Sequence, residues 1–125
     1  MLRVLVVDDN VDAAKALAML LGYFHCDVEV AFDGEAALAA AEHMEPHVAI
    51  LDLGLPRIDG FELARRIRRL PWGKRTMLIA LSGWGQAEDR IRSREAGFDL
   101  HLVKPVDSPA LLRILDTVRT ELPSE

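Results

Sequence analysis

Two short apolar runs in the sequence each end at acidic residues. Residues 4–7 (VLVV) are followed by Asp8 and Asp9, and residues 48–51 (VAIL) are followed by Asp52. Short apolar runs of this kind are typical of buried strands in a parallel sheet. Because ligands of open α/β sheets bind at the carboxyl ends of the strands, we expect the three carboxylates to meet at a functional edge.

Carboxylates gathered at one edge repel one another. Two like charges about 4 Å apart repel by roughly 4 kcal/mol at an effective dielectric constant of ~20. A divalent cation that prefers oxygen ligands, such as Mg²⁺, would offset this cost. The cluster of Asp8, Asp9 and Asp52 is therefore predicted to be a small Mg²⁺ site for phosphoryl chemistry.

Strand-like and helix-like segments alternate along the chain. Strands are predicted at residues 2–7, 27–31, 47–51, 77–81 and 100–103. Helices are predicted around residues 14–21 with Gly22 as the stop, from the capping residue Asp33 to Met44, from Asp59 to residue 70, over residues 88–96, and from Asp107 to Leu122.

This alternation predicts a doubly wound α/β fold, in which helices cover both faces of a central parallel five-stranded sheet. We expect the flavodoxin-like (βα)5 strand order 2-1-3-4-5, which places the first and third strands side by side at the switch point. The 125 residues fit one domain covering residues 1–125.

Composition argues against several classes of protein. The formal net charge of -5 argues against a nucleic-acid binder, because phosphate backbones require a basic surface. The single cysteine, Cys26, excludes an internal disulfide and a multi-cysteine zinc site. No apolar run approaches the ~20 residues of a membrane span, and the N-terminus is not a signal peptide, so a cytoplasmic location is expected.

Charged residues concentrate in the third and fourth predicted helices. Four arginines are predicted to form the exposed face of the third helix: Arg65, Arg66, Arg68 and Arg69. The fourth helix is polar, so little apolar area holds it in place, and it is expected to shift easily.

Two more predicted strands end in polar residues that suit phosphoryl transfer. Ser82 follows the fourth strand, and Lys104 follows the fifth. A carboxylate can attack a phosphoryl group as a nucleophile, and an ammonium neutralises the charge of that group. A hydroxyl can donate a hydrogen bond to a phosphoryl oxygen.

Taken together, these segments resemble the receiver domain of bacterial two-component response regulators over nearly the whole chain. The matching motifs are VVDDN at residues 6–10, LDLGLP at 51–56 with DG at 59–60, LSG at 81–83, and KP at 104–105. The segments at 80–86, 96–99 and 101–105 look most like receivers attached to hybrid sensor kinases.

The resemblance implies a phosphoacceptor and its partners. Asp52 would accept a phosphoryl group from a phosphohistidine of a sensor histidine kinase or a histidine phosphotransfer protein. Asp8 and Asp9, together with Asp52 and the backbone carbonyl of Gly54, would hold Mg²⁺. The domain would catalyse only its own phosphorylation and slow dephosphorylation, so it is not expected to be an enzyme in the ordinary sense.

The resemblance also implies a switch. Lys104 would bind the phosphoryl group, its bond to Pro105 would be cis, and Ser82 would move to the phosphoryl group. The surface formed by the fourth helix, fifth strand and fifth helix would then change shape. That surface is expected to contact a downstream effector, the parent chain, or a second copy in a homodimer.

Three residues depart from the family pattern. His101 stands where the family has Tyr or Phe, so the switch partner of Ser82 would be a ring that titrates near neutrality. Gly54 stands where many receivers carry a polar side chain, and Trp84 stands two residues beyond Ser82. Because glycine offers no polar group to orient the attacking water molecule, and tryptophan would shield the site, slow autodephosphorylation is predicted.

Three other functions compete with this one. A phosphohydrolase with an aspartyl nucleophile needs a second carboxylate nearby, but Leu53 and Gly54 follow Asp52. A flavodoxin needs a Ser/Thr/Gly-rich phosphate loop after the first strand, where this chain has acidic residues. A docking module of the same fold that works without phosphorylation stays open as the alternative, because of His101.

Overall fold

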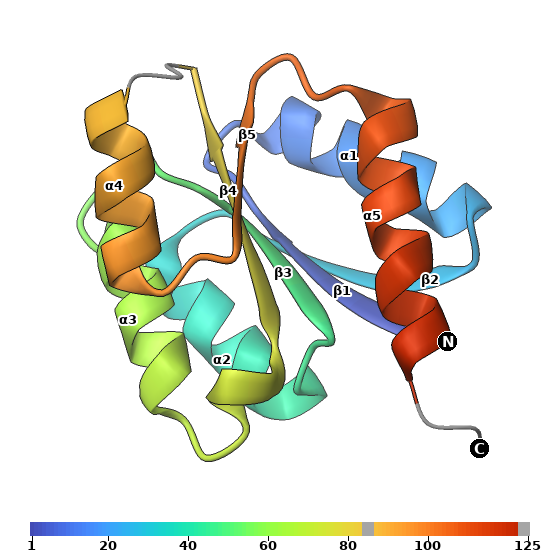
Figure 1. Ribbon diagram of the computed structural model, residues 1–125, viewed down its shortest axis with the longest axis horizontal. Helices are drawn as coiled ribbons and strands as arrows, with labels where there is room; N and C mark the ends of the chain where they lie inside the picture. The colour runs from blue at the N-terminus through green and yellow to red at the C-terminus, as the bar shows by residue number, and fades with distance from the viewer. Residues whose placement is uncertain (84–86, 123–125) are drawn as a thin grey trace.

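The structure, a computed structural model, describes residues 1–83 and 87–122. Five parallel strands form one sheet in the order β2-β1-β3-β4-β5 (Figure 1). The strands are β1 (Leu2–Val7), β2 (Cys26–Ala31), β3 (Val48–Asp52), β4 (Met77–Ser82) and β5 (Leu100–Val103). The predicted doubly wound, flavodoxin-like order 2-1-3-4-5 is confirmed.

In the described residues, five α-helices connect and flank the strands. They are α1 (Val11–Tyr23), α2 (Gly34–Met44), α3 (Gly60–Arg69), α4 (Ala87–Ala96) and α5 (Ser108–Glu121), and a short 3-10 helix, η1 (Gly73–Arg75), follows α3. The helix predicted around residues 14–21 is longer than expected, because α1 continues through Gly22 and ends where the Phe24 amide bonds to the Leu21 and Gly22 carbonyls.

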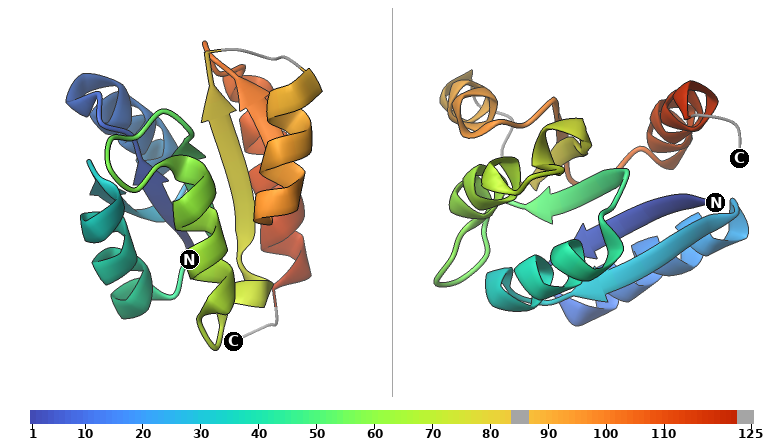
Figure 2. Two further views of the ribbon diagram at one scale, coloured as in Figure 1. Left: turned by 90° about the vertical axis from the view of Figure 1, so that its left-hand side faces the viewer. Right: turned by 90° about the horizontal axis from the view of Figure 1, so that it is seen from below.

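The helices form two layers around the sheet. Helices α1 and α5 cover one face, and α2, α3 and α4 cover the other (Figure 2). Alternate strand residues supply the two cores, so that Leu51 packs with Phe61 of α3 while Ile50 packs with Leu115 of α5. All five residues of β3 are buried. A strand covered on both faces is apolar throughout, which explains the uninterrupted runs in the sequence.

Side-chain caps fix where four helices begin. Each capping oxygen accepts a hydrogen bond from a backbone amide three residues later, which satisfies a donor that the helix leaves unpaired. The caps are Asn10 for α1, Asp33 for α2, Asp59 for α3 and Asp107 for α5. Since the helices follow strands, these caps also shape the loops at the carboxyl edge of the sheet.

Helix α4 is weakly anchored, as predicted. Of its described side chains only Ser93 and Ala96 are buried, and Ile91 is 56% exposed. Its Arg92 guanidinium lies 4.1 Å from the centroid of the Phe61 ring of α3. This helix is therefore held mostly by small and polar contacts.

The Lys104–Pro105 peptide bond is cis, as the resemblance implied. Trp84 lies outside the described residues, so its role stays a prediction. No helix within the described ranges has the length and apolar character needed to cross a membrane.

The prediction that Arg68 lies on the exposed face of α3 is wrong. Its side chain is 20% exposed and bonds to the Asp99 carboxylate at 2.9 Å. It also donates to the carbonyl oxygens of Gly73, Thr76 and Gly97 at 2.6–2.9 Å. The guanidinium has five donors, which suits it to bind several loop carbonyl groups at once. Arg68 therefore joins the loops after α3 and α4.

We predict that Arg68→Ala lowers the free energy of unfolding by about 3 kcal/mol, because it leaves part-buried carbonyl groups unpaired. Urea denaturation would measure the change. Arg69→Ala is the matched control, because Arg69 is exposed on the same helix and should shift stability by at most about 0.5 kcal/mol. Equal losses in the two variants would contradict the role assigned to Arg68.

Candidate functional site

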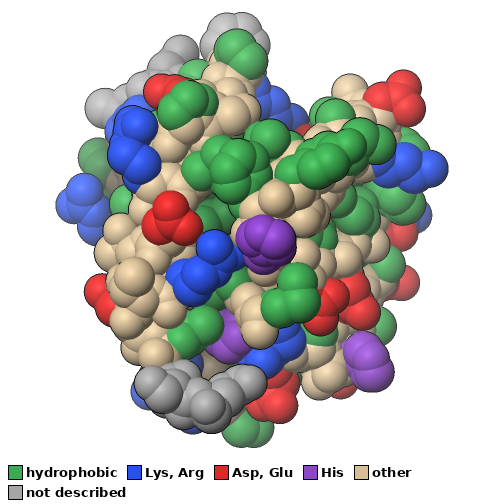
Figure 3. All heavy atoms as spheres, turned by 90° about the vertical axis from the view of Figure 1, so that its right-hand side faces the viewer, with side chains coloured by type: hydrophobic (Ala, Val, Ile, Leu, Met, Phe, Trp, Pro, Cys, Tyr) green, Lys and Arg blue, Asp and Glu red, His purple; other side chains and the backbone are tan. Residues whose placement is uncertain are grey.

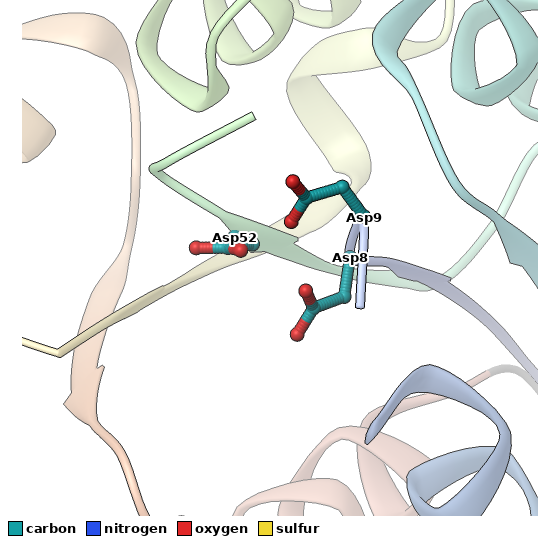
Figure 4. Close-up of side chains that lie close together, drawn as sticks. All are labelled: Asp8, Asp9 and Asp52. Carbon is teal, nitrogen blue, oxygen red and sulfur yellow. The ribbon is translucent and has the colours of Figure 1, made fainter. Parts of the chain in front are cut away.

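Asp8, Asp9 and Asp52 lie together at the carboxyl edge of the sheet, and their side chains extend into one space (Figure 4). Strands β1 and β3 pair in parallel with Val7 opposite Leu51, so the residues that follow on the two strands are neighbours. One carboxylate oxygen of each aspartate lies within 4.8 Å of the other two. Asp8 and Asp52 are buried, whereas Asp9 is exposed, so the cluster is open on one side.

Lys104, just after β5, reaches into this acidic cluster. Its Nζ lies 3.0 Å from Oδ2 of Asp8 and 3.4 Å from Oδ2 of Asp52. The Oδ1 atoms of the same carboxylates accept hydrogen bonds from the Asn10 and Gly54 amides, both at 3.0 Å. Backbone amides thus orient the two carboxylates, and the ammonium bridges them.

Burial and charge change the ionisation of these groups. Burial raises the pKa of Asp52, and the Asp8 carboxylate raises it further, against the Gly54 amide and the Lys104 ammonium, which lower it. Burial lowers the pKa of Lys104, but its hydrogen bond with Asp8 and the charge of Asp52 outweigh burial and raise it overall. Lys104 therefore stays protonated at neutral pH, and three carboxylates face one ammonium.

Ser82, the last residue of β4, lies beside the cluster. Leu81, its neighbour, pairs with Asp52 across the sheet, and the Lys104 amide donates to the Ser82 carbonyl at 2.8 Å. The Ser82 Oγ lies 2.7 Å from Nε2 of His101 on β5. The structure therefore brings together the serine and the histidine that the sequence predicted as a switch pair.

Comparisons with known proteins agree with this geometry. The sequence model of the family described as response regulator receiver domain matches residues 4–116. The chain belongs to this family. It is thus a receiver domain of the kind used in two-component systems, and its sheet order is that of receiver structures.

The similarity covers different shares of the individual relatives' own lengths. The chemotaxis protein CheY4 of Vibrio cholerae superposes with a TM-score of 0.89 at 31% identity, over 94% of this chain and 98% of that one. Protein PilG of Pseudomonas aeruginosa is 32% identical over 98% of this chain and 89% of its own length. The virulence sensor protein BvgS of Bordetella pertussis is 38% identical over 98% of this chain, but over only 10% of its own length. The chain also spans less than half of several other relatives.

The acidic cluster fits the Mg²⁺ that receiver domains generally bind in an acidic pocket. All its donors are oxygens, its negative charge exceeds that of the single ammonium, and one side is open for water ligands, as a hard divalent cation requires. Gly54 is exposed, and its amide donates a hydrogen bond to Oδ1 of Asp52, so Gly54 lies at the rim of the acidic cluster. Its role as a carbonyl ligand stays a prediction.

Sequence reasoning missed Ser93. This α4 residue is buried, and its Oγ lies 3.2 Å from Nδ1 of His101. The sequence carries a faint signal, because Ser93 and Ala96 are small residues three apart within a charged segment, which is the spacing of one helix face. Nothing in that pattern indicates that the serine would meet a ring on β5.

A mostly apolar cavity of about 300 Å³ adjoins the acidic cluster. Asp8 and Lys104 lie among its lining residues, together with Leu17 and Leu20 of α1 and Val106 of the segment before α5. The receiver site is therefore flanked by an apolar recess between α1 and α5.

We predict that Asp52→Asn raises the free energy of unfolding without Mg²⁺ by on the order of 1 kcal/mol, because it removes a charge that burial disfavours. Since the folded-state pKa of Asp52 lies above its unfolded value, the gain is full above the folded-state pKa and shrinks as the pH falls below it. Urea denaturation at several pH values would measure it.

MgCl2 should stabilise the wild type more than Asp52→Asn. Asp27→Asn serves as the matched control, because Asp27 is exposed on β2, and this variant should respond to MgCl2 as the wild type does. Equal stabilisation of all three proteins would contradict a metal site that includes Asp52.

Proposed function

We propose that this receiver, acting as one unit over residues 1–125 in the cytoplasm, accepts a phosphoryl group from a phosphohistidine onto Asp52 in a Mg²⁺-dependent reaction. The observation that carries the proposal is the bridge of the Lys104 ammonium between the Asp8 and Asp52 carboxylates in a buried cluster. An acidic site with a fixed ammonium suits a transferred group whose negative charge must be neutralised.

In the proposed reaction a carboxylate oxygen of Asp52 attacks phosphorus, and the bond from phosphorus to the imidazole nitrogen of the partner breaks. The Gly54 amide orients the Asp52 carboxylate through Oδ1. Nζ of Lys104 lies 3.4 Å from Oδ2 of Asp52, where its positive charge can neutralise the negative charge of the incoming phosphoryl group. Mg²⁺ held by Asp8, Asp9, Asp52 and the Gly54 carbonyl would add positive charge next to the phosphoryl oxygens.

The proposed donor is a sensor histidine kinase or a histidine phosphotransfer protein that docks beside α1. The apolar cavity at Leu17 and Leu20 leads to Asp8 and Lys104. Hydrophobic side chains gather on the upper part of the α1 and α5 face (Figure 3), and Met19 of α1 is 65% exposed. A partner helix laid along this surface would reach the acidic cluster with its phosphohistidine.

The proposed output surface is formed by α4, β5 and α5. Ser82 and His101 link it to the acidic cluster, and Ile91, Leu100 and Val103 expose apolar area on it. When Ser82 turns toward the phosphoryl group, the weakly anchored α4 follows at low cost. The partner there would be an effector, the parent chain or a second copy.

We predict that acetyl phosphate with Mg²⁺ adds one phosphoryl group to the wild type and none to Asp52→Asn, as read by intact mass. The reason is that Asp52 alone is the nucleophile in this proposal. EDTA should abolish the gain. Asp116→Asn is the matched control, because its side chain is 72% exposed on α5, and it should be phosphorylated normally.

The other outcomes separate the rivals. Turnover of many phosphates per protein would indicate a phosphohydrolase, and a yellow protein would indicate bound flavin. No phosphorylation under any of these conditions would favour the docking module that works without phosphate.

We predict slow autodephosphorylation, which Gly54→Asn should accelerate by on the order of tenfold, or ~1.4 kcal/mol of barrier. Glycine has no group to orient the attacking water, whereas an asparagine amide can. There is room for the change, because a Cβ at Gly54 would meet Asp52 Oδ1 at 3.7 Å, an ordinary contact. The decay of the phosphorylated mass would measure the rate.

Gly54→Ala is the matched control for this rate, since it adds the Cβ without the amide. It should decay at the wild-type rate. A wild-type lifetime of seconds, or no difference between Gly54→Asn and Gly54→Ala, would contradict the prediction.

A further inference from the structure

A continuous chain of hydrogen bonds runs from Ser82, which lies beside the acidic cluster, through His101 to Ser93 of α4. The Ser82 Oγ lies 2.7 Å from His101 Nε2, and His101 Nδ1 lies 3.2 Å from the Ser93 Oγ. The Ser93 hydroxyl also donates to the Arg90 carbonyl at 3.0 Å within α4. Both nitrogens of the ring therefore have serine partners, one on each side.

The position of the Ser93 proton sets the direction of this chain. A hydroxyl has one proton, and that of Ser93 is directed to the Arg90 carbonyl. The contact of Ser93 with His101 then requires Nδ1 to be the donor, so the neutral ring has a bare Nε2. At 2.7 Å that nitrogen accepts the proton of Ser82. In the resting state the Ser82 hydroxyl thus donates to His101.

The neutral form of His101 agrees with its surroundings. Burial lowers the pKa of His101, the Arg90 charge lowers it further, and Asp89 opposes them. Arg94 of α4 and Asp99 before β5 line a cavity of about 230 Å³ with the ring. On β4 the ring's neighbours are the uncharged Ala80 and Ser82, and α5 packs on the opposite face of the sheet, in the core with Ile50. The cavity gives the ring access to solvent protons.

The phosphorylated state places a different demand on Ser82. In the proposed function, on which this inference rests, the Ser82 hydroxyl donates its proton to a phosphoryl oxygen. Its oxygen would then face the bare Nε2 of His101 with no proton between them. For the ring to carry its proton on Nε2 instead, the Ser93 hydroxyl would have to turn from the Arg90 carbonyl to Nδ1, and the hydrogen bond within α4 would be lost.

We propose that Ser93 is a positioning residue that fixes His101 as the acceptor of the Ser82 proton, and that phosphorylation of Asp52 is coupled to the uptake of one proton by His101. The proton comes from solvent and binds Nε2, the Ser82 proton turns from Nε2 to a phosphoryl oxygen, and Nε2 then donates to the Ser82 oxygen. No other bond changes. The phosphoryl group adds about -1.5 to -2 of charge, which favours the imidazolium.

The sign of the pH dependence follows from this exchange. His101 is neutral in the resting state and protonated in the phosphorylated state, so its proton affinity is higher in the latter. The phosphorylated conformation is therefore favoured as the pH falls through the higher of the two pKa values, and it loses this support above it.

The test is an NMR titration of the histidine ring signals with Mg²⁺, with and without beryllofluoride, a reagent that activates another receiver domain. Activation should raise the proton affinity of His101 by at least about tenfold. The ring signals of the exposed His43 on α2 serve as the internal control. An unchanged or lower proton affinity of His101 in the activated protein overturns the proposed proton uptake.

Ser93→Ala tests the positioning role without removing the ring. Without its Ser93 partner the neutral ring can carry its proton on Nε2 and donate to Ser82, so activation no longer needs a proton. Nitrogen shifts should report the change of tautomer, and the pH dependence of activation should fall to that of His101→Phe. Ser93→Thr, which keeps the hydroxyl, should restore the wild-type behaviour. Wild-type tautomer and pH dependence in Ser93→Ala would overturn the proposal.

The two proposals fail in different ways. If acetyl phosphate does not modify Asp52 and beryllofluoride does not bind, the proposed function fails, and the proposed proton uptake fails with it. If both react and the His101 proton affinity does not rise, only the proposed proton uptake fails.

Discussion

The ammonium of Lys104 holds two carboxylates in place that would otherwise repel each other. Its Nζ lies 3.0 Å from Asp8 and 3.4 Å from Asp52, at the ends of β1 and β3. This contact joins the end of β5 to the centre of the sheet, and it leaves the cluster with more negative than positive charge. The ammonium therefore offsets part of the repulsion, and the remaining negative charge favours a divalent cation, as the proposed phosphoryl transfer requires.

Polar contacts connect this site to α4, along the path of the proposed switch. Helix α4 buries little apolar area, and its buried Ser93 meets the ring of His101. Hydrogen bonds depend on where protons lie, so such a link responds to charge and pH more than an apolar contact would. The aromatic residue that the family usually has in this place would bury more apolar area. With histidine, the same position would couple the proposed switch to a proton.

Most of the fold and of the acidic site follows from local patterns. Apolar runs, helical spacing and capping residues such as Asp33 and Asp107 indicate the elements, and parallel strands bring their carboxyl ends together. Arg68 and Ser93 were not predicted, because their roles depend on partners distant in the sequence or on another element. In the sequence Arg68 cannot be distinguished from an exposed arginine, because its partner, the Gly97 carbonyl, is 29 residues away.

The sequence by itself determined the strands, the helices and the groups at the sheet edge, because period and strand ends are local properties. The order of the strands followed from their alternation with helices, which few folds accommodate. Only the tertiary structure decided which oxygen faces Lys104, where the Ser82 hydroxyl points and which side chain fixes His101. Hydrogen bonds form over distances near 3 Å between groups with defined protons, and no spacing along a chain specifies that geometry.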